Sequence, residues 1–274
     1  MPLTQERAAE LSELCRHFRI DALKAIHGIQ SGHPGGSLSV CEILTLLYQE
    51  KMNIEKVDDP DRDRLVLCKG HAAPMLYRNL IEKGFLPKDS MPTLRKIDSL
   101  LQGHPSNHTP GVEMPSGPLG IGLSAAQGMA IGLKLNNSTA RVYAVLGDGE
   151  LNEGAVWEAA MSAPKFKLDN LTAIVDYNKV QLDGTTEEIM PIRDIEGKWR
   201  SFGWNVIRCD GHDLMALERA LETAANHTEG PSVIIADTFK GKGVSFMEGK
   251  AAWHGKPLTD EDLANAIAEL GGEN

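Results

Sequence analysis

The sequence predicts an α/β fold, built as a doubly wound, mainly parallel sheet flanked by helices. Three observations support this prediction. Short β-branched runs recur along the chain, helical stretches separate them, and from residue 141 onward the two kinds of segment alternate regularly. Such alternation is typical of parallel strands joined by right-handed helical crossovers. Four of the runs are almost continuously apolar, which favours strands buried on both faces of the sheet.

The N-terminal part of the chain is expected to be mainly helical. Residues 4–30 carry Leu11, Phe18, Ala22 and Ile26 at helical spacing, which predicts a long helix with one apolar face. A second helix is expected over residues 40–48. The short run 65–67 predicts the first strand.

The later elements follow in alternation. The four apolar runs predict strands over residues 141–146, 171–176, 204–209 and 232–239. Helices are expected over residues 124–135, 155–163 and 214–225. The stretch 102–122 is rich in Gly, Pro and Ser. We interpret it as a functional loop folded over the sheet rather than a linker, because it contains two histidines and a series of glycines.

The composition indicates a globular protein. Of 274 residues, 42% are hydrophobic and 24% are charged, which argues against a disordered tail, a collagen-like repeat and a coiled coil. At about 150 residues per domain, this length allows one large domain or two small ones. No linker divides the chain convincingly, so we expect one domain over residues 1–274.

The charge balance limits the partners. The chain has 28 Lys+Arg and 38 Asp+Glu, a net charge of −10, which disfavours nucleic acid and anionic membranes. The uncharged window 114–133 is as long as a membrane span, but its glycines and prolines indicate a loop followed by a helix. The N-terminus does not resemble a signal peptide, and the four cysteines lack metal or redox spacing. We therefore expect a cytoplasmic protein with reduced thiols.

The strongest local signal for chemistry is the run Gly147–Gly154, directly after a predicted strand. Ligands of open α/β sheets bind outside the carboxyl ends of the strands, and a helix that begins there offers free N–H groups to a phosphate. Asp148 supplies a hard oxygen suited to Mg²⁺ or Ca²⁺. Asn178 and the backbone carbonyl of Val180 follow the next strand. A Gly-Asp-Gly alone is most simply a turn, but with the second strand end it favours a metal–diphosphate site.

Four of the nine histidines stand beside glycine at predicted loop positions, namely His33, His71, His104 and His254. A single loop histidine is usually just solvated. All four follow predicted helices or strands instead of lying in amphipathic stripes, so we interpret them as ligand-binding groups. Imidazole near neutral pH can hold hydroxyls and phosphates and move protons.

The loop 116–124 has glycines that allow its backbone to approach a ligand closely, with Leu119 between them as an apolar face. It does not follow a predicted strand as a GxGxxG motif would, so a dinucleotide-binding fingerprint is not supported.

Eight motifs in order resemble the N-terminal part of transketolase. They are SGHPGGSLS, KGHAAPMLY, QGHPS, SGPLGIGLS, GDGELNEG, DYNKVQLDG, KGKGVSFMEG and WHGKPL, and they extend over nearly the whole chain. The resemblance implies the diphosphate-binding domain of a thiamine-diphosphate enzyme. Ser106 follows GHP where many full-length members carry an acidic residue.

The resemblance also implies roles for individual residues. The ligands of Mg²⁺ (or Ca²⁺) would be Asp148, Asn178 and the carbonyl of Val180. The cofactor would contact Gly149, His71, His254 and Asn178 near its diphosphate, and Gly117, Pro118 and Leu119 near its rings. The catalytic group would comprise His33, His104 and His254, which would contact sugar hydroxyls, and Glu153, which would face the partner domain and support its cofactor-activating glutamate.

A full-length transketolase continues into a pyrimidine-binding domain and a C-terminal domain, which this sequence lacks. The resemblance therefore implies the N-terminal subunit of a split transketolase, which joins a larger C-terminal subunit in an α2β2 assembly and is active only with it. With thiamine diphosphate (ThDP) and a divalent metal, it would move a two-carbon ketol unit from a ketose phosphate to an aldose in carbohydrate metabolism of the pentose-phosphate type. Two alternatives are a subunit of another ThDP ketose synthase and a non-catalytic assembly module.

Overall fold

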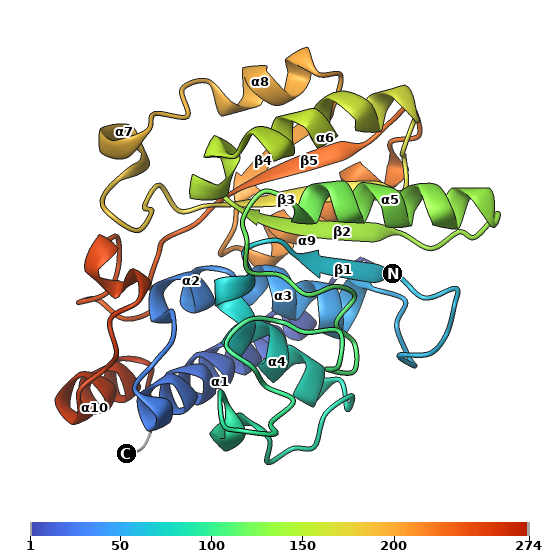
Figure 1. Cartoon of the computed structure of the whole chain (residues 1–274). Helices are drawn as coiled ribbons and strands as arrows, with labels where there is room; N and C mark the ends of the chain where they lie inside the picture. The colour runs from blue at the N-terminus through green and yellow to red at the C-terminus, as the bar shows by residue number, and fades with distance from the viewer. Residues whose placement is uncertain (1, 273–274) are drawn as a thin grey trace.

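The computed structural model describes residues 2–272 and has a five-stranded parallel sheet at its centre (Figure 1). The strand order is β1-β2-β3-β5-β4, and every neighbouring pair is parallel. The strands are β1 (Arg64–Leu67), β2 (Val142–Gly147), β3 (Leu171–Tyr177), β4 (Asn205–Asp210) and β5 (Ser232–Asp237). The chain moves outward from β1 to β4 and then returns to place β5 inside, which confirms the predicted doubly wound sheet.

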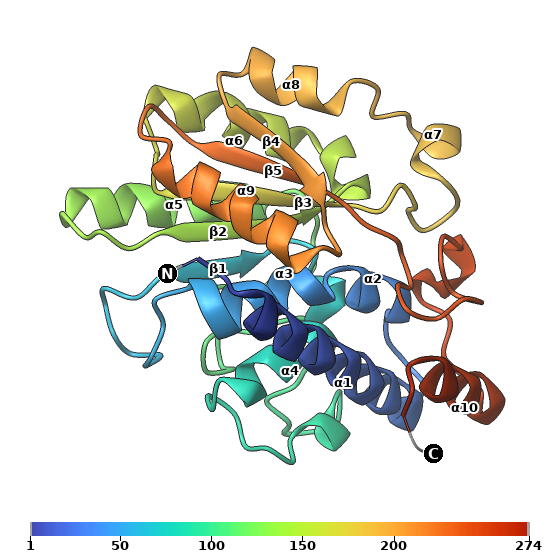
Figure 2. The same ribbon diagram turned by 180° about the vertical axis from the view of Figure 1, so that it is seen from behind.

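Helices cover both faces of the sheet. One face packs against α5 (Gly122–Leu135), α6 (Gly154–Lys165) and α8 (Ile195–Ser201). The other side holds α1 (Gln5–Ile29), α2 (Pro34–Ser39), α3 (Cys41–Leu46), α4 (Ala73–Glu82), α9 (Leu214–Asn226) and α10 (Asp260–Glu269). Figure 1 shows α5 and α6 in front of the sheet, and Figure 2 shows α9 and α1 on the opposite side. The remaining helix, α7 (Thr186–Ile189), is a single turn.

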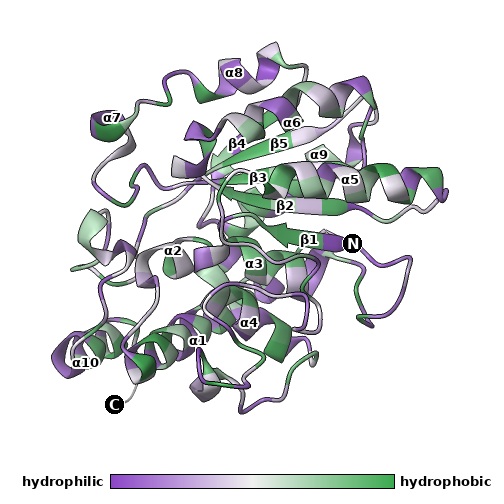
Figure 3. Cartoon of the chain, in the orientation of Figure 1, coloured by the Kyte–Doolittle hydropathy of each residue, from purple (hydrophilic) through white to green (hydrophobic). Residues whose placement is uncertain are grey.

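The strands divide their side chains between two hydrophobic cores. In β2, Val142, Ala144 and Leu146 join the core under α5 and α6, whereas Tyr143 and Val145 join the core under α1 and α9. This alternation follows from the two-residue period of a strand. The central strands are therefore coloured mainly as hydrophobic in Figure 3.

Most predicted elements are confirmed with small changes at their ends. The predicted helix 4–30 is α1, which Thr4 caps by accepting a hydrogen bond from the Arg7 N–H. Sequence patterns did not predict α2, α4, α7, α8 and α10. Nearly every residue of α4 is buried, so it has no polar face to reveal a helical period. The helices α2, α7 and α8 have at most seven residues, which is too short for a helical period to show in the sequence.

The prediction that all four later strands are buried on both faces is wrong for β4. This strand lies at the edge of the sheet and is half-buried, with Arg208 and Asp210 on its C-terminal part. Arg208 pairs with Asp237 of β5 and with Glu196 of α8. Charged residues along an edge strand are a common protection against pairing with other chains. The cysteines are all free thiols, buried except for half-buried Cys209 in the same strand. Between residues 2 and 272, no helix is both long and apolar enough to cross a bilayer.

Candidate active site

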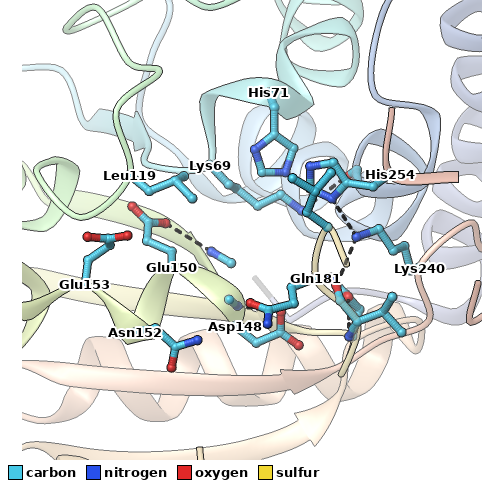
Figure 4. Close-up of a pocket in the computed structure, with 16 residues that line it drawn as sticks. Lys69, His71, Leu119, Asp148, Glu150, Asn152, Glu153, Gln181, Lys240 and His254 are labelled. Carbon is cyan, nitrogen blue, oxygen red and sulfur yellow. Dashed lines mark hydrogen bonds between the residues drawn. The ribbon is translucent and has the colours of Figure 1, made fainter. Parts of the chain in front are cut away.

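A cavity of about 280 Å³ opens at the carboxyl edge of the sheet (Figure 4). It is formed by the segments that follow β1, β2, β3 and β5, together with the loop before α5. Of the residues predicted from the sequence, eight line this cavity: His71, Leu119, Asp148, Gly149, Glu153, Asn178, Val180 and His254. Segments far apart in the chain are thus brought to one edge because all the strands are parallel.

The two predicted metal loops lie side by side. Asp148 is 2% exposed and accepts hydrogen bonds from the N–H groups of Gly149, at 2.8 Å, and of Lys179. The Asn178 side-chain oxygen accepts from the Val180 N–H at 3.2 Å. The Val180 carbonyl accepts from the Lys240 ammonium at 2.9 Å. β2 and β3 are paired in register up to Gly147 and Asp176, which sets these loops next to each other.

These groups have the chemistry of a site for a hard cation. Burial and the nearby Asp176 carboxylate raise the pKa of Asp148 to about 7, so a cation beside it would hold it ionised. A carboxylate, a side-chain amide and a backbone carbonyl are the oxygen ligands that Mg²⁺ and Ca²⁺ prefer. No group of three His, Cys, Asp or Glu side chains in residues 2–272 could hold a metal, so any ion here would depend on the amide and carbonyl oxygens as well as on Asp148.

The four predicted histidines form one cluster. The ring centre of His33 is 5.3 Å from those of His71 and His254 and 6.1 Å from that of His104. The rings of His71 and His254 are 5.0 Å apart. The four residues come from the start of α2, the turn after β1, the loop before α5 and the turn before α10. The sequence predicted each one singly, and the fold assembles them.

The environment keeps these histidines neutral at pH 7. Burial lowers the pKa of His33 to about 4 and that of His254 to about 3, with neighbouring cations adding to both effects. Burial and Lys69 hold the pKa of His71 well below its ordinary value. A neutral imidazole donates at one nitrogen and accepts at the other, which suits binding of hydroxyl-rich ligands. The buried Nδ1 of His33 has no hydrogen-bond partner within the described structure.

These histidines are expected to make stability fall in mild acid. Between pH about 6.5 and about 4, unfolded histidines bind protons that folded His33 and His254 do not. Their contribution is therefore complete above pH 6.5 and is lost as the pH falls. The raised pKa values of Asp148 and Glu150 act in the opposite sense, so the comparison must be with a variant. Urea unfolding at pH 7, 6 and 5 should show a smaller acid loss for His254→Asn than for the wild type. Equal losses would contradict the lowered pKa of His254.

The loop before α5 is held tightly because glycines remove side chains at its contacts. A Cβ at Gly70 would lie within 2.9 Å of Ser116, and a Cβ at Gly122 would lie 2.5–2.9 Å from Cys68. Leu119, which lies between Ser116 and Gly122 in the sequence, lines the cavity and is 37% exposed. Gly117 approaches the ring of His104, with 3.6 Å from its Cβ position to the ring carbons. Pro118 does not line the cavity.

This packing makes a prediction about two glycines of α5. Gly122→Ala should destabilise the chain by about 1–3 kcal/mol, because its methyl group would overlap Cys68. Gly128→Ala is the matched control, since nothing lies within 4 Å of its Cβ position and alanine favours helix by up to about 1 kcal/mol. Denaturant unfolding of both variants measures the difference. Similar stabilities would show that the loop can move away from Cys68.

Sequence reasoning missed four charged residues of the site. Lys69 forms a buried ion pair with Asp176, which lies at the end of β3. Lys240 donates to Val180 and contacts Nδ1 of His254 at 2.9 Å. Glu150 is buried beside the metal loop. All four residues belong to the motifs KGH, DYN, KGKG and GDGE. Lysine, aspartate and glutamate are usually exposed, so the sequence did not indicate that these four are buried.

Comparison with known proteins agrees with this arrangement. A family model described as the transketolase thiamine diphosphate binding domain matches residues 11–274. The chain belongs to the transketolase family. It is thus a thiamine diphosphate binding domain of the transketolase type, and the fold predicted from the motif series is confirmed.

Two relatives illustrate the similarity. A 6-deoxy-6-sulfo-D-fructose transketolase subunit, SqwG, from Clostridium sp. (strain MSTE9) is 44% identical over 268 residues, which cover 97% of this chain and 98% of the relative. An apulose-4-phosphate transketolase subunit from Actinobacillus succinogenes is 44% identical over 242 residues, which cover 87% of each chain.

Solved transketolase structures share the fold. The transketolase from Campylobacter jejuni superposes with a TM-score of 0.90 at 31% identity, over 96% of this chain. The chain spans 43% of the length of that protein. The match to full-length transketolases is therefore limited to their diphosphate-binding part.

Proposed function

We propose that this chain is the N-terminal subunit of a two-subunit transketolase, a transferase that depends on ThDP and on Mg²⁺ or Ca²⁺. The reaction moves a two-carbon ketol unit from a ketose phosphate to an aldose acceptor. When bound, the thiazolium of ThDP supplies the electron sink that cleavage of the ketose C–C bond requires. The residues of this chain bind and orient the cofactor and the sugar.

One observation supports the proposal above all others. The oxygen ligands at Asp148, Asn178 and Val180 lie on the same cavity as the neutral histidines His71 and His254. The first group suits a metal-bound diphosphate, and the second suits hydroxyl groups of a sugar. A purely structural domain would have no use for both on one cavity, and the loop 116–124 lacks the glycine fingerprint of a dinucleotide-binding domain.

We assign to the individual residues the roles that the resemblance to transketolase implies. Asp148, Asn178 and the Val180 carbonyl hold the metal, with Gly149 against the diphosphate. His71 and His254 lie by the diphosphate, and Lys240 adds a positive charge beside them. His33 and His104 bind sugar hydroxyls, with His254 also within their reach. Leu119, which lines the cavity, borders the rings of the cofactor, and we propose that its neighbours Gly117 and Pro118, which do not line the cavity, come close to the rings when the cofactor binds.

The proposed assembly is an α2β2 heterotetramer with a larger subunit that carries the pyrimidine-binding domain. Names of relatives support this arrangement, since the Clostridium and Actinobacillus proteins are both called subunits and this chain covers 98% and 87% of their lengths. In the assembly Glu153, which is exposed at the rim of the cavity, faces the partner. We treat residues 1–274 as one domain and place the enzyme in the cytoplasm.

The substrates are proposed as phosphorylated or sulfonated ketoses, because the two relatives are named for a sulfosugar and for a branched sugar phosphate. The test is a donor and acceptor screen with the reconstituted complex, ThDP and Mg²⁺, in which transfer of two carbons is followed by mass spectrometry. Formation of a product two carbons longer than the aldose is expected. A folded complex that binds ThDP but transfers no ketol unit from any tested ketose phosphate or sulfonate would contradict the proposed activity.

A further inference from the structure

Glu150 occupies an unusual position for a carboxylate. It is 2% exposed, and no lysine or arginine in residues 2–272 forms an ion pair with it. Burial of an isolated carboxylate is costly unless hydrogen bonds stabilise it. Both of its oxygens accept such bonds from the backbone. The Gly120 N–H lies 2.9 Å from Oε1 and the Gly147 N–H lies 3.2 Å from Oε2.

The two donors come from different segments beside the cavity, and each is next in sequence to a residue that lines it. Gly120 follows Leu119 in the loop before α5, and Gly147 precedes Asp148 at the end of β2. In Figure 4 the side chain of Glu150 lies between Leu119 and Asp148. A single carboxylate therefore joins the loop that carries Leu119 to the strand end that carries Asp148.

The position that donates to Glu150 requires a glycine. Gly120 has φ +92°, and a Cβ there would lie 2.6 Å from Cβ of Glu153. Earlier in the loop, the Ser116 N–H donates to the carbonyl of Pro105 at 3.2 Å. The bond to Glu150 thus anchors the loop close to Leu119, whereas the bond at Ser116 anchors its beginning.

We propose that Glu150 is a positioning residue that fixes the loop of residues 116–122, and with it Leu119, at a set distance from the Asp148 loop. The inference rests on the proposed function for its consequence, because the two segments would hold different parts of ThDP. A fixed separation orders both segments before the cofactor enters, which reduces the entropy lost on binding. Glu150 itself acts through the backbone and does not need to touch the cofactor.

The two hydrogen bonds by which Glu150 holds the loop of residues 116–122 are called the clamp. Hydrogen exchange of the full chain without cofactor tests the clamp directly. In Glu150→Ala the Gly120 amide loses its acceptor, so peptides covering residues 116–122 should exchange at least about tenfold faster than in the wild type. Glu150→Gln keeps one carbonyl oxygen and loses the second, so its exchange rate should lie between those of the wild type and the alanine variant. This conservative variant also provides the measurement if the alanine variant does not fold.

Glu218→Gln is the matched control. Glu218 is another buried carboxylate, 3% exposed, which accepts from the Leu3 N–H and pairs with Lys51 away from the cavity. It should lower overall stability without a selective change in residues 116–122. Unchanged exchange of this loop in the folded Glu150 variants, or a uniform increase over the whole chain as in the control, would overturn the proposal.

A second measurement separates the clamp from the proposed function. In the reconstituted complex, Glu150→Gln should raise the KM for ThDP more than it lowers kcat, because the variant must order the loop of residues 116–122 when the cofactor binds. If exchange accelerates but ThDP does not bind even to the wild-type complex, the clamp stands and the proposed function fails. If the wild-type complex is active and loop exchange is unchanged in the variants, the clamp fails alone.

Discussion

Replacement of Asp148 by alanine is expected to weaken metal-dependent ThDP binding by the complex by at least about 100-fold and to abolish ketol transfer. Loss of a residue that only orients a metal ligand typically costs 10–100-fold in affinity, and Asp148 is the single carboxylate of the proposed ligand set. The amide of Asn178 and the carbonyl of Val180 cannot balance the charge of a divalent ion. Titration calorimetry with ThDP at fixed Mg²⁺ measures the loss.

Two further variants sharpen this result. Asp148→Asn removes the charge but keeps one oxygen, which can accept from only one of the two N–H groups, those of Gly149 and Lys179, that bind separate oxygens of the carboxylate. It should therefore lose less stability than Asp148→Ala and still bind metal poorly. Asp169→Asn changes a partly exposed carboxylate away from the cavity and should bind ThDP normally. Affinity within about threefold of the wild type for Asp148→Ala would show that Asp148 is not a metal ligand.

Replacement of Lys69 by methionine is expected to destabilise the chain by about 3–5 kcal/mol. Lys69 is 1% exposed and Asp176 is fully buried, so removal of the ammonium leaves a carboxylate without a counter-charge. Hydroxyl groups still donate to Asp176, one from Ser39 at 2.6 Å and one from Thr238. These bonds moderate the loss but do not replace the charge. Denaturant unfolding at pH 7 measures it.

The matched control is Lys134→Met, which breaks an ion pair with Asp169 that is more than a third exposed on its lysine side. Exposed pairs contribute below about 1 kcal/mol. The two losses should also respond differently to pH. In Lys69→Met, burial raises the pKa of Asp176, so the stability deficit should grow as the pH rises from 5 to 8. Equal, pH-independent losses in both variants would contradict the buried ion pair.

The sequence predicted the parts of the site that local patterns record. Asp148 and Asn178 each follow an apolar strand, and parallel strands bring their carboxyl ends to one edge. The loop histidines were recognisable because glycine and proline mark their turns. The resemblance to transketolase then assigned their roles, and the family match confirms the family.

The remaining parts depend on contacts between distant segments, which no local pattern records. Lys69 and Asp176 are 107 positions apart, and only the folded sheet makes them partners. Glu150 lies in a predicted motif, yet its two hydrogen bonds depend on how the loop before α5 crosses the end of β2. The edge position of β4 was hidden for a similar reason, since its apolar residues resemble those of a central strand.

The central claim is that this chain supplies the diphosphate half of a ThDP site and needs a partner subunit for turnover. The direct measurement compares ketol transfer by the purified chain with transfer after addition of the proposed partner, at the same ThDP and Mg²⁺ concentrations. We predict no turnover by the chain alone and turnover that saturates as the partner is added. Turnover by the chain alone at the rate of the mixture would contradict the claim.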